Sequence, residues 1–293
     1  MTALPLGARL LRQIGLQTWI PFGLRDRLLR HFVNPDTLAP APFTCDFFGR
    51  RYDGDLASFI DWSVFFHGAY ERGLLNFLKN AAALGGPQSV FLDIGANVGQ
   101  HSLFMSAHAS HVHAFEPWAV ARDAISRKIA LNRIANITVH GVGLSDRAHE
   151  ETFFAPTLSN RGTGSFISGH NLSNRELGRL PLVAGDAYLA EQGIDRVDLI
   201  KLDAEGFEPL ILAGLTATLR RCRPVVAFEM SMADTRPGQN PASILTPFGD
   251  GWTAYVLGGG PDHYQLRPFA EAREGITVVM VPAEKEAGLA RAG

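Results

Sequence analysis

From residue 88 onward, short apolar runs alternate with stretches of helical period. The runs of strand length are QSVFLDIGA, HVHAFEP, ITVHGVGLSD, VDLIKLDAEG and PVVAFEM. The helical stretches between them include NVGQHSLFMSAH, LILAGLTATLRR and AVARDAISRKIALNR, whose inner face carries Val120, Ala124, Ile125 and Ile129. Strands that alternate with helices predict an α/β fold with a doubly wound, mostly parallel sheet and right-handed crossovers.

Two later segments depart from this alternation. Near the C-terminus, WTAYVLGGGPDHYQLRP and GITVVMVP predict an antiparallel hairpin that closes one edge and completes a seven-stranded sheet. An insertion at about residues 147–182 is too long and polar for a simple connection. Within it, NRGTGSF predicts a glycine-bearing turn between two short antiparallel strands, and both a surface hairpin and a substrate lid remain open as interpretations.

The first 35 residues are basic and apolar, with one acid, Asp26, among five arginines. This pattern predicts two short helices broken at Pro21. These helices either pack on the main domain with their arginines in water, or lie on an anionic membrane surface or bind an acidic partner. A proline-rich loop follows, and a helix is expected from about Tyr70 to the glycine pair at 85–86. We therefore divide the chain into an N-terminal arm and helical cap, residues 1–85, and a main domain, residues 86–293.

Composition limits the function classes. The chain has 293 residues, of which 46% are hydrophobic and 19% charged, enough for one large or two small globular domains. A formal charge of −2 gives no basic field for nucleic-acid binding. Cys45 and Cys222 lack CxxC spacing and suggest a reducing compartment. Because no apolar run reaches the roughly 20 residues of a membrane span, and no signal-peptide core is visible, we expect a cytoplasmic protein.

Carboxylates gather at the ends of the predicted parallel strands. Asp93, Glu116, Asp146, Asp203 and Glu229 each stand at or directly after a strand end. In doubly wound sheets, ligands bind outside the carboxyl ends of the strands. We therefore expect these acids to surround a ligand site.

The first predicted strand leads into the turn DIGANVG. Gly95 and Gly99 allow a tight turn and close backbone approach, but Asn97 breaks the G-x-G-x-x-G spacing of dinucleotide-binding folds. Asp93 beside this turn suits a ligand with a positive centre. Glu116, 23 positions later, can accept hydrogen bonds from both hydroxyls of a ribose. A nucleoside with a cationic or amino-acid tail, such as S-adenosylmethionine, satisfies both acids.

Several motifs over residues 65–230 resemble those of the FkbM family of class I S-adenosylmethionine-dependent methyltransferases. They are FLDIGANVGQHSLFMSAHASHVHAFEP, the asparagine pair in NRIAN, GLSD, NRGTGSF and DLIKLDAEGFEPLILAG. The resemblance implies a Rossmann-like fold and O-methylation of a sugar, glycolipid or other small-molecule hydroxyl. It also implies that the methionine part is held by Asp93, Gly95, Asn97 and Gly99, the ribose by Glu116, and the adenine edge by the turn with Asp146.

The stretch VDLIKLDAEGFEP places catalytic candidates at the centre of the sheet. Lys201, Asp203 and Glu205 are expected to alternate onto one face of a strand, while Glu208 with Pro209 is expected to start the next helix. Transfer to a hydroxyl needs alignment and removal of its proton. Asp203 or Glu205 can accept that proton, and Lys201 can pair with the carboxylate or lower the pKa of the acceptor hydroxyl.

A magnesium ion held by Asp203 and Glu229 is an alternative way to orient and acidify the hydroxyl. The family resemblance does not imply a metal, and two carboxylates are too few to specify one. We therefore do not assign a metal site. In HASHVH, a strand should place His111 and His113 on one face, away from His108, which favours a structural role over metal binding.

The segment FFHGAYE supplies further candidates. His67, Tyr70 and Glu71 either line the cofactor or acceptor pocket or, for Tyr70 and the two phenylalanines, pack in the core. Two other function classes also remain: a nicotinamide-dependent oxidoreductase, and a non-catalytic scaffold that contacts the inner membrane face through residues 1–35. The acceptor, the methyl-accepting atom and the oligomeric state are not determined by the sequence.

Overall fold

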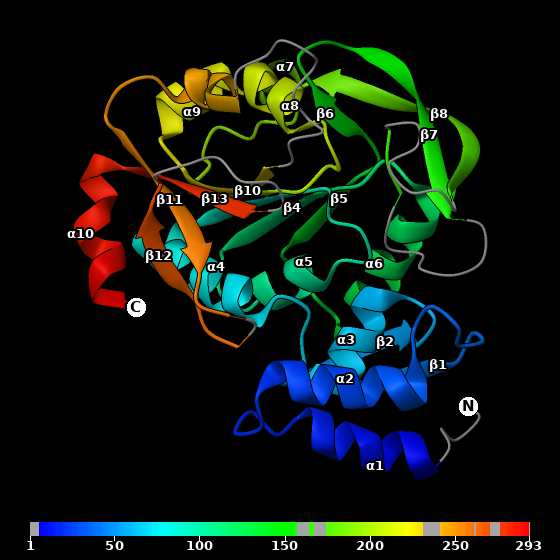
Figure 1. Cartoon of the computed structure of the whole chain (residues 1–293). Coiled ribbons are helices and arrows are strands. Elements are labelled where there is room, and N and C mark those ends of the chain that lie inside the picture. The colour runs from blue at the N-terminus through cyan, green and yellow to red at the C-terminus, as the bar shows by residue number, and fades with distance from the viewer. Residues whose placement is uncertain are drawn as a thin grey trace.

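A single large sheet forms the centre of the molecule (Figure 1). The structure is a computed structural model that describes residues 6–156, 164–166, 174–230, 241–260, 262–269 and 276–292. The strand order in the sheet is β12-β11-β13-β10-β9-β3-β4-β5. In chain order, the bounds are Val90–Ile94 (β3), His111–Phe115 (β4), Ile137–His140 (β5), Leu199–Leu202 (β9), Val225–Met230 (β10), Trp252–Gly258 (β11), Gln265–Pro268 (β12) and Ile276–Pro282 (β13).

The predicted parallel sheet with an antiparallel C-terminal edge is confirmed. Strands β10, β9, β3, β4 and β5 pair in parallel, whereas β13, β11 and β12 each join their neighbour antiparallel. The expectation of seven strands is wrong by one, since eight are present in the described residues. The additional strand is the short β12, in which an arginine and a proline interrupt the apolar pattern, so that hydrophobicity alone gives it little signal.

Helices cover both faces of the sheet. On one face lie Arg72–Leu84 (α4), Gln100–Met105 (α5), Ala119–Asn132 (α6) and Ala283–Ala292 (α10), and on the other lie Gly185–Glu191 (α7), Glu208–Gly214 (α8) and Thr216–Cys222 (α9) (Figure 1). The described residues also include two 3-10 segments, Gly86–Gln88 (η1) and Pro241–Phe248 (η3). Because successive side chains of a strand point to opposite faces of the sheet, neighbouring residues belong to different hydrophobic clusters. Phe91 packs in the cluster under α4, and Leu92 packs in the cluster under α8.

The segment ITVHGVGLSD was expected to form one strand, and this is wrong. It divides into β5 and Gly143–Ser145 (β6), which leaves the main sheet. There β6 pairs in parallel with Asn174–Ala184 (β8), which pairs antiparallel with His149–Pro156 (β7). The insertion at about residues 147–182 is therefore an antiparallel hairpin, as one interpretation proposed. Of the predicted turn NRGTGSF, residues 160–163 lie outside the described residues.

The inner face of α6 also differs from the expectation. Val120 is 50% exposed, and Ala121 takes its place beside Ala124 and Ile125 on the buried face. Lys128 completes that face and is only 2% exposed. A helical period starting from Ala121 places residue 128 inward, but a search for apolar residues passes over a lysine.

An N-terminal arm packs below the sheet as two helices, Leu6–Gly15 (α1) and Phe22–Val33 (α2), followed by a hairpin of Pro42–Phe47 (β1) and Arg50–Asp55 (β2) and by Phe59–His67 (α3) (Figure 1). The predicted break at Pro21 and the stop of α4 before Gly85 are confirmed. No helix among the described residues is both long enough and apolar enough to cross a membrane.

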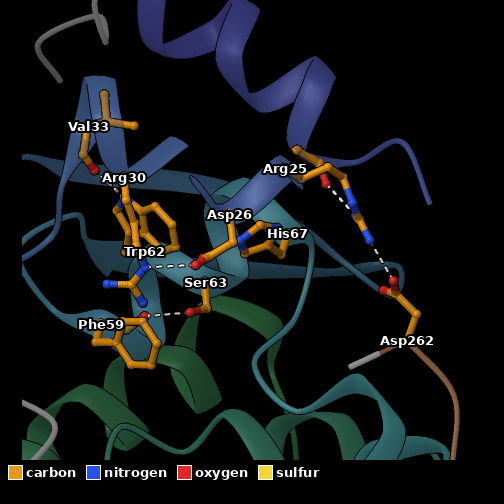
Figure 2. Close-up of polar contacts among 10 residues, drawn as sticks. Arg25, Asp26, Arg30, Val33, Phe59, Trp62, Ser63, His67 and Asp262 are labelled. Atoms are coloured by element: carbon orange, nitrogen blue, oxygen red, sulfur yellow. Dashed lines mark hydrogen bonds and ion pairs between the residues drawn. The ribbon is translucent and has the colours of Figure 1, made fainter. Parts of the chain in front are cut away.

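Polar contacts fasten the arm to the rest of the molecule (Figure 2). The Arg25 guanidinium donates to the carbonyl of Gly15 at 2.7 Å and to Asp262 Oδ2 at 2.5 Å. Asp26 accepts from Arg30 at 2.8 Å and lies 3.3 Å from His67 Nε2. The expectation that the arginines of this arm lie in water is thus wrong for Arg25, which is buried because its partner comes from the loop between β11 and β12.

Candidate active site

A cavity opens where the central strands end. Its wall includes the last residues of β3 and β4, the loop after β9 and the end of β10, which is the position that a doubly wound sheet offers to ligands. We call it the transfer cavity. Of the predicted site residues, the transfer cavity is lined by Gly95, Asn97, Glu116, Lys201, Asp203, Glu205 and Glu229. Asp93, Gly99 and Asp146 lie outside this lining.

The turn after β3 has the backbone that its glycines suggest. Gly95, Asn97 and Gly99 have φ values of 74°, 53° and 80°, all in the left-handed region. A Cβ atom built on Gly95 would stand 1.8 Å from the carbonyl oxygen of Asp203, so only glycine fits there. This close approach joins the turn after β3 to the loop after β9. Helix α5 begins at Gln100, slightly later than the expected start near Val98.

Glu116 is buried directly after β4 and faces the transfer cavity. Its Oε2 accepts the N–H of Asn97 at 2.9 Å, and its Oε1 accepts the N–H of Trp118 at 2.9 Å. Burial raises the pKa of this carboxyl to about 7, against the two N–H donors, which lower it. Each oxygen keeps a second lone pair, so the carboxylate is fixed in orientation and can still accept a ligand hydroxyl.

Asp93 lies behind the cavity wall. The carboxylate is fully buried, accepts the Ser102 hydroxyl at 2.5 Å and stands 3.8 Å from Lys201 Nζ. Burial raises the pKa of Asp93, while the Lys201 ammonium opposes that shift. Asp93 therefore contacts Lys201, which lines the transfer cavity, without lining the cavity itself.

Lys201 is the central cation of the site. Its ammonium donates to Asp203 Oδ2 at 3.2 Å and to the carbonyl of Gly95 at 3.2 Å. Although burial alone would lower its pKa, the carboxylates of Asp203, Asp93 and Glu71 raise it above the ordinary value. Lys201 therefore stays charged and holds Asp203 at the mouth of β9.

The alternation expected through Glu205 ends earlier, because β9 stops at Leu202. Glu205 has φ 53° and belongs to a turn, yet it still lines the transfer cavity. Glu208 shapes this turn, since its carboxylate accepts the N–H groups of Ala204 at 2.6 Å and Gly206 at 2.9 Å. The prediction that Glu208 starts a helix is confirmed, because α8 begins at this residue.

Asp203 and Glu229 both reach the transfer cavity from neighbouring strands. In the part of the chain that the structure describes, no group of three or more His, Cys, Asp or Glu side chains is placed to hold a metal ion. Asp203 and Glu229 are thus the two carboxylates that the sequence proposed as magnesium ligands, and the described residues place no third side chain beside them to complete a metal site.

One residue at the site, His101, was not singled out from the sequence, whereas Glu71, which was expected at the pocket, lies next to His101 outside the cavity lining. His101, from the first turn of α5, is buried, lines the transfer cavity and lies with its Nε2 3.6 Å from Glu71 Oε2. Burial and the Lys201 ammonium lower the pKa of His101, so its imidazole is neutral. For Glu71, burial raises the pKa to about 7, and the charge of Asp203 adds to this shift. The motif search missed His101 because nothing in NVGQHS distinguishes it from a helix residue.

The segment FFHGAYE has a mixed outcome. Tyr70 lines the transfer cavity and also packs against Phe59 with ring centroids 5.8 Å apart, so both interpretations hold for it. His67 lies away from the cavity, where it contacts Asp26 and the rings of Phe22 and Trp62. It is a packing residue that fastens α2 to α3.

On the side of the cavity expected to take the adenine, apolar groups dominate. Gly143 and Leu144 of β6, Phe153 of β7, and Gly164 and Phe166 line the wall. Asp146 follows β6, where it accepts the Ser145 hydroxyl at 3.2 Å and lies 3.4 Å from Arg147 Nη1. The hairpin insertion thus contributes aromatic walls to the transfer cavity, whereas Asp146 stands outside it.

The histidines of HASHVH lie apart from the transfer cavity. His111 and His113 share one face of β4, as expected, with ring centroids 4.5 Å apart. His113 Nδ1 lies 3.0 Å from Nε2 of His140 on β5, and His140 Nδ1 lies 3.2 Å from the Tyr188 hydroxyl. His111 and His113 thus contact other residues of the sheet, and these contacts do not involve His108.

Comparison with known proteins identifies similar chains. The family model described as "Methyltransferase FkbM domain" matches residues 93–272. The antimetabolite synthetase AmbE of Pseudomonas aeruginosa is 32% identical over 52% of this chain and 9% of its own length. The 31-O-demethyl-FK506 methyltransferase FkbM of Streptomyces tacrolimicus is 31% identical over 48% of this chain and 65% of its own length. The hexuronic acid methyltransferase AglP of Haloferax volcanii is 27% identical over 47% of this chain and 54% of its own length.

The chain thus spans less than two thirds of each of these relatives. Among solved structures, methyltransferase FkbM from Methylobacillus flagellatus has a TM-score of 0.43 at 15% identity, with coverage of 66% of this chain and 43% of its own. A SAM-dependent methyltransferase from Agrobacterium tumefaciens has a TM-score of 0.45 at 11% identity, with coverage of 85% and 72%. Likenesses this weak carry no argument about this chain.

Proposed function

Because this chain belongs to the FkbM family of S-adenosylmethionine-dependent methyltransferases, we propose that it methylates a hydroxyl of a saccharide, glycolipid or other small-molecule acceptor. The observation that carries the proposal is the group at the end of β9. There a buried ammonium, Lys201, holds Asp203 at the wall of the transfer cavity, beside the neutral His101. This arrangement suits the removal of a proton from a hydroxyl.

The residues of the cavity fit the cofactor that the family uses. The fixed Glu116 carboxylate is placed to accept ribose hydroxyls, and the close-packed turn at Gly95 and Asn97 offers backbone groups to the amino-acid part. The apolar wall near Leu144 and Phe153 suits a purine ring. When bound, S-adenosylmethionine supplies an electrophilic methyl group on a sulfonium.

The protein's own part in transfer is to align the hydroxyl and take up its proton. Asp203, whose Oδ2 lies 3.2 Å from Lys201 Nζ, is our first candidate for the proton acceptor. The Glu71 carboxyl, with its pKa of about 7, lies beside His101 and provides a second proton acceptor near neutrality. The Lys201 ammonium can also stabilise negative charge that develops on the acceptor oxygen.

Calorimetric titration with S-adenosylhomocysteine, followed by turnover on saccharide acceptors, tests this function. We expect Glu116→Ala to lose most of the cofactor affinity, whereas Glu191→Ala, at an exposed position, binds as the wild type does. We expect Asp203→Asn to bind the cofactor and lose turnover by about a hundredfold or more. The exposed Asp195→Asn serves as its matched control.

Full turnover by Asp203→Asn at saturating cofactor would remove Asp203 as the proton acceptor. Cofactor binding without transfer to any hydroxyl would instead favour the non-catalytic scaffold, and binding of a nicotinamide dinucleotide alone would revive the oxidoreductase. Magnesium added during turnover distinguishes a metal-assisted route, for which Glu229→Gln should abolish the metal's effect.

We also propose that the arm contacts the inner face of a membrane. Leu10, Trp19, Leu24 and Phe32 are exposed on α1, α2 and the turn between them, and Trp19 is 78% exposed. The exposed arginines Arg9 and Arg27 add positive charge to these helices. Apolar side chains flanked by cations suit an anionic lipid surface.

Sedimentation with phosphatidylserine vesicles tests this contact. We expect the wild type to pellet and the double variant Trp19→Ala, Leu24→Ala to stay in the supernatant, with phosphatidylcholine vesicles as the control surface. Point variants are preferable to deletion of residues 1–35, because Arg25 and Asp26 of the arm bond to Asp262 and His67. Equal pelleting of both proteins would remove this contact.

A further inference from the structure

A second cavity, of about 590 Å³, lies beneath the N-terminal arm. We call it the arm cavity. Its wall is shared by α1, the hairpin of β1 and β2, the start of α3 and the buried face of α6. Val98, Trp118 and Ala121 line both the arm cavity and the transfer cavity, so the two adjoin. None of the polar residues deep in the arm cavity takes part in the function proposed above.

One hydroxyl in the arm cavity is buried without a hydrogen bond. Ser58, immediately before α3, lines this cavity and is 2% exposed. Its Oγ finds no partner among the described residues. Asp53 Oδ1, also at this wall, is likewise buried without a hydrogen-bond partner among the described residues. The other oxygen of this carboxylate, Oδ2, lies 3.2 Å from Arg127 Nε. Because an unpaired buried polar group costs about 1–3 kcal/mol, such groups are expected where a ligand completes them.

A buried ammonium faces the same space. The Nζ of Lys128 lies 4.3 Å from the centroid of the Tyr52 ring, and no carboxylate oxygen of the described residues is within 4.0 Å of it. Asp61, the acid that most influences Lys128, already accepts the Tyr52 hydroxyl at 2.6 Å and the N–H of Asp55 at 3.0 Å. Lys128 thus keeps hydrogen-bond donors for a ligand.

The charges around the arm cavity balance. Arg9, Arg127 and Lys128 stand against Asp53, Asp55 and Asp61. A net-charged ligand would meet as much repulsion as attraction, whereas a hydroxyl both donates and accepts and can bridge an ammonium and a carboxylate. Phe43 and Trp118 add aromatic faces to the wall, against which the apolar face of a ring can pack.

We propose that the arm cavity binds a neutral sugar ring of the acceptor, through Ser58 Oγ, Lys128 Nζ and Asp53 Oδ1, while the hydroxyl to be methylated reaches the adjoining transfer cavity. Only the statement that the hydroxyl is methylated in the transfer cavity rests on the proposed function. Binding of a sugar in the arm cavity is a property of the residues named here, and it can be measured without turnover.

Saturation-transfer NMR on the full chain tests the binding. The probes are the methyl glycosides of glucose, galactose, mannose, rhamnose and N-acetylglucosamine, with glucuronic acid as the acidic member. We expect at least one neutral probe to bind, and Lys128→Met and Ser58→Ala each to weaken that binding by about tenfold, the loss of one hydrogen-bond partner. Exposed Lys79→Met and Ser110→Ala are the matched controls and should bind as the wild type does.

Ser58→Ala keeps the test decisive if Lys128→Met fails to fold, since removal of an unpaired hydroxyl should not destabilise the fold. No signal from any neutral probe, binding confined to glucuronic acid, or binding that survives Ser58→Ala would each overturn the proposal. Titration of the same samples with S-adenosylhomocysteine is read separately. Its failure would contradict the proposed function, while loss of sugar binding alone contradicts only this inference.

Discussion

At the scale of single residues, burial gives Glu116 and Glu71 carboxyl groups that change charge near neutral pH. The pKa of each is raised to about 7, mainly by burial, and for Glu71, whose side chain is 35% exposed, the charge of Asp203 adds to the shift. Their surroundings differ, since Glu116 accepts the N–H of Asn97 at the transfer cavity and Glu71 stands beside His101.

The affinity for S-adenosylhomocysteine should therefore depend on pH through Glu116. Above pH 7 the carboxylate is ionised and accepts hydroxyl hydrogens, while below it the added proton removes acceptor capacity. We expect the affinity to fall as the pH drops from 8 to 6, with a limiting slope of about tenfold per pH unit. Calorimetry should find Glu71→Gln still pH-dependent and Glu116→Gln weak at every pH. A flat profile for the wild type would contradict this role.

His113 and His140 should make the stability of the fold depend on acid. Burial lowers the pKa of each to about 4, from an ordinary value of 6.5. A depressed pKa means that the folded state favours the neutral rings, so this stability is complete above pH 6.5 and is lost as pH falls toward 4. Urea unfolding at pH 7 and pH 5 measures the loss. His113→Asn with His140→Asn should reduce the difference, whereas the exposed His31→Asn should not.

At the scale of elements, Glu208 connects the start of α8 to the loop after β9. The first residue of α8 accepts two N–H groups of the loop that follows Asp203. Glu208→Ala should lower kcat more than it raises the cofactor KM, because Asp203 and Glu205 lose their fixed position while Glu116 keeps its own. We expect a stability loss of about 1–3 kcal/mol and partial rescue by Glu208→Gln. A variant with normal kcat would show that the loop is held by other contacts.

The sequence foretold the elements whose signal is local. The run of β9, the break at Pro21 and the helix start at Glu208 all follow from side-chain period and from helix-end preferences. The pattern failed where long-range packing decides. Nothing between His140 and Gly143 indicates that the chain leaves one sheet for another, and Lys128 is buried only because the hairpin of the arm covers it.

The same distinction holds for the candidate site. Strand-end acids could be recognised because a parallel sheet brings its carboxyl ends together. Asp93 is separated from the cavity by the Lys201 side chain, which lies between them. Asp146 lies outside the cavity because β6 leaves the main sheet to pair with β8. The surroundings of His101 and the arm cavity both depend on how residues 1–85 pack against the main domain. A single sequence does not indicate such long-range contacts.

At the scale of the whole molecule, Arg25 links the arm to the C-terminal strands. Arg25→Met removes the donor to the Gly15 carbonyl and the 2.5 Å contact to Asp262, which among the described residues keeps only Arg72 at 3.7 Å, and we expect the free energy of unfolding to fall by about 2–3 kcal/mol. This is less than for a wholly buried pair, since Asp262 is partly exposed. Denaturant midpoints measure the loss, and the exposed Arg27→Met should unfold like the wild type. Equal midpoints for the two variants would show that the arm contributes no such link.

The ion pair between Arg25 and Asp262 also limits how early the arm can dock while the chain is being synthesised. The arm leaves the ribosome before Asp262, the acid that neutralises its buried guanidinium, which follows Arg25 by 237 residues. Until then, the docked position of α2 would leave a cation buried without its counter-charge, so final docking of the arm has to await the last strands of the sheet. Although α2 is made before Asp262, it therefore reaches its final position only after Asp262 is present.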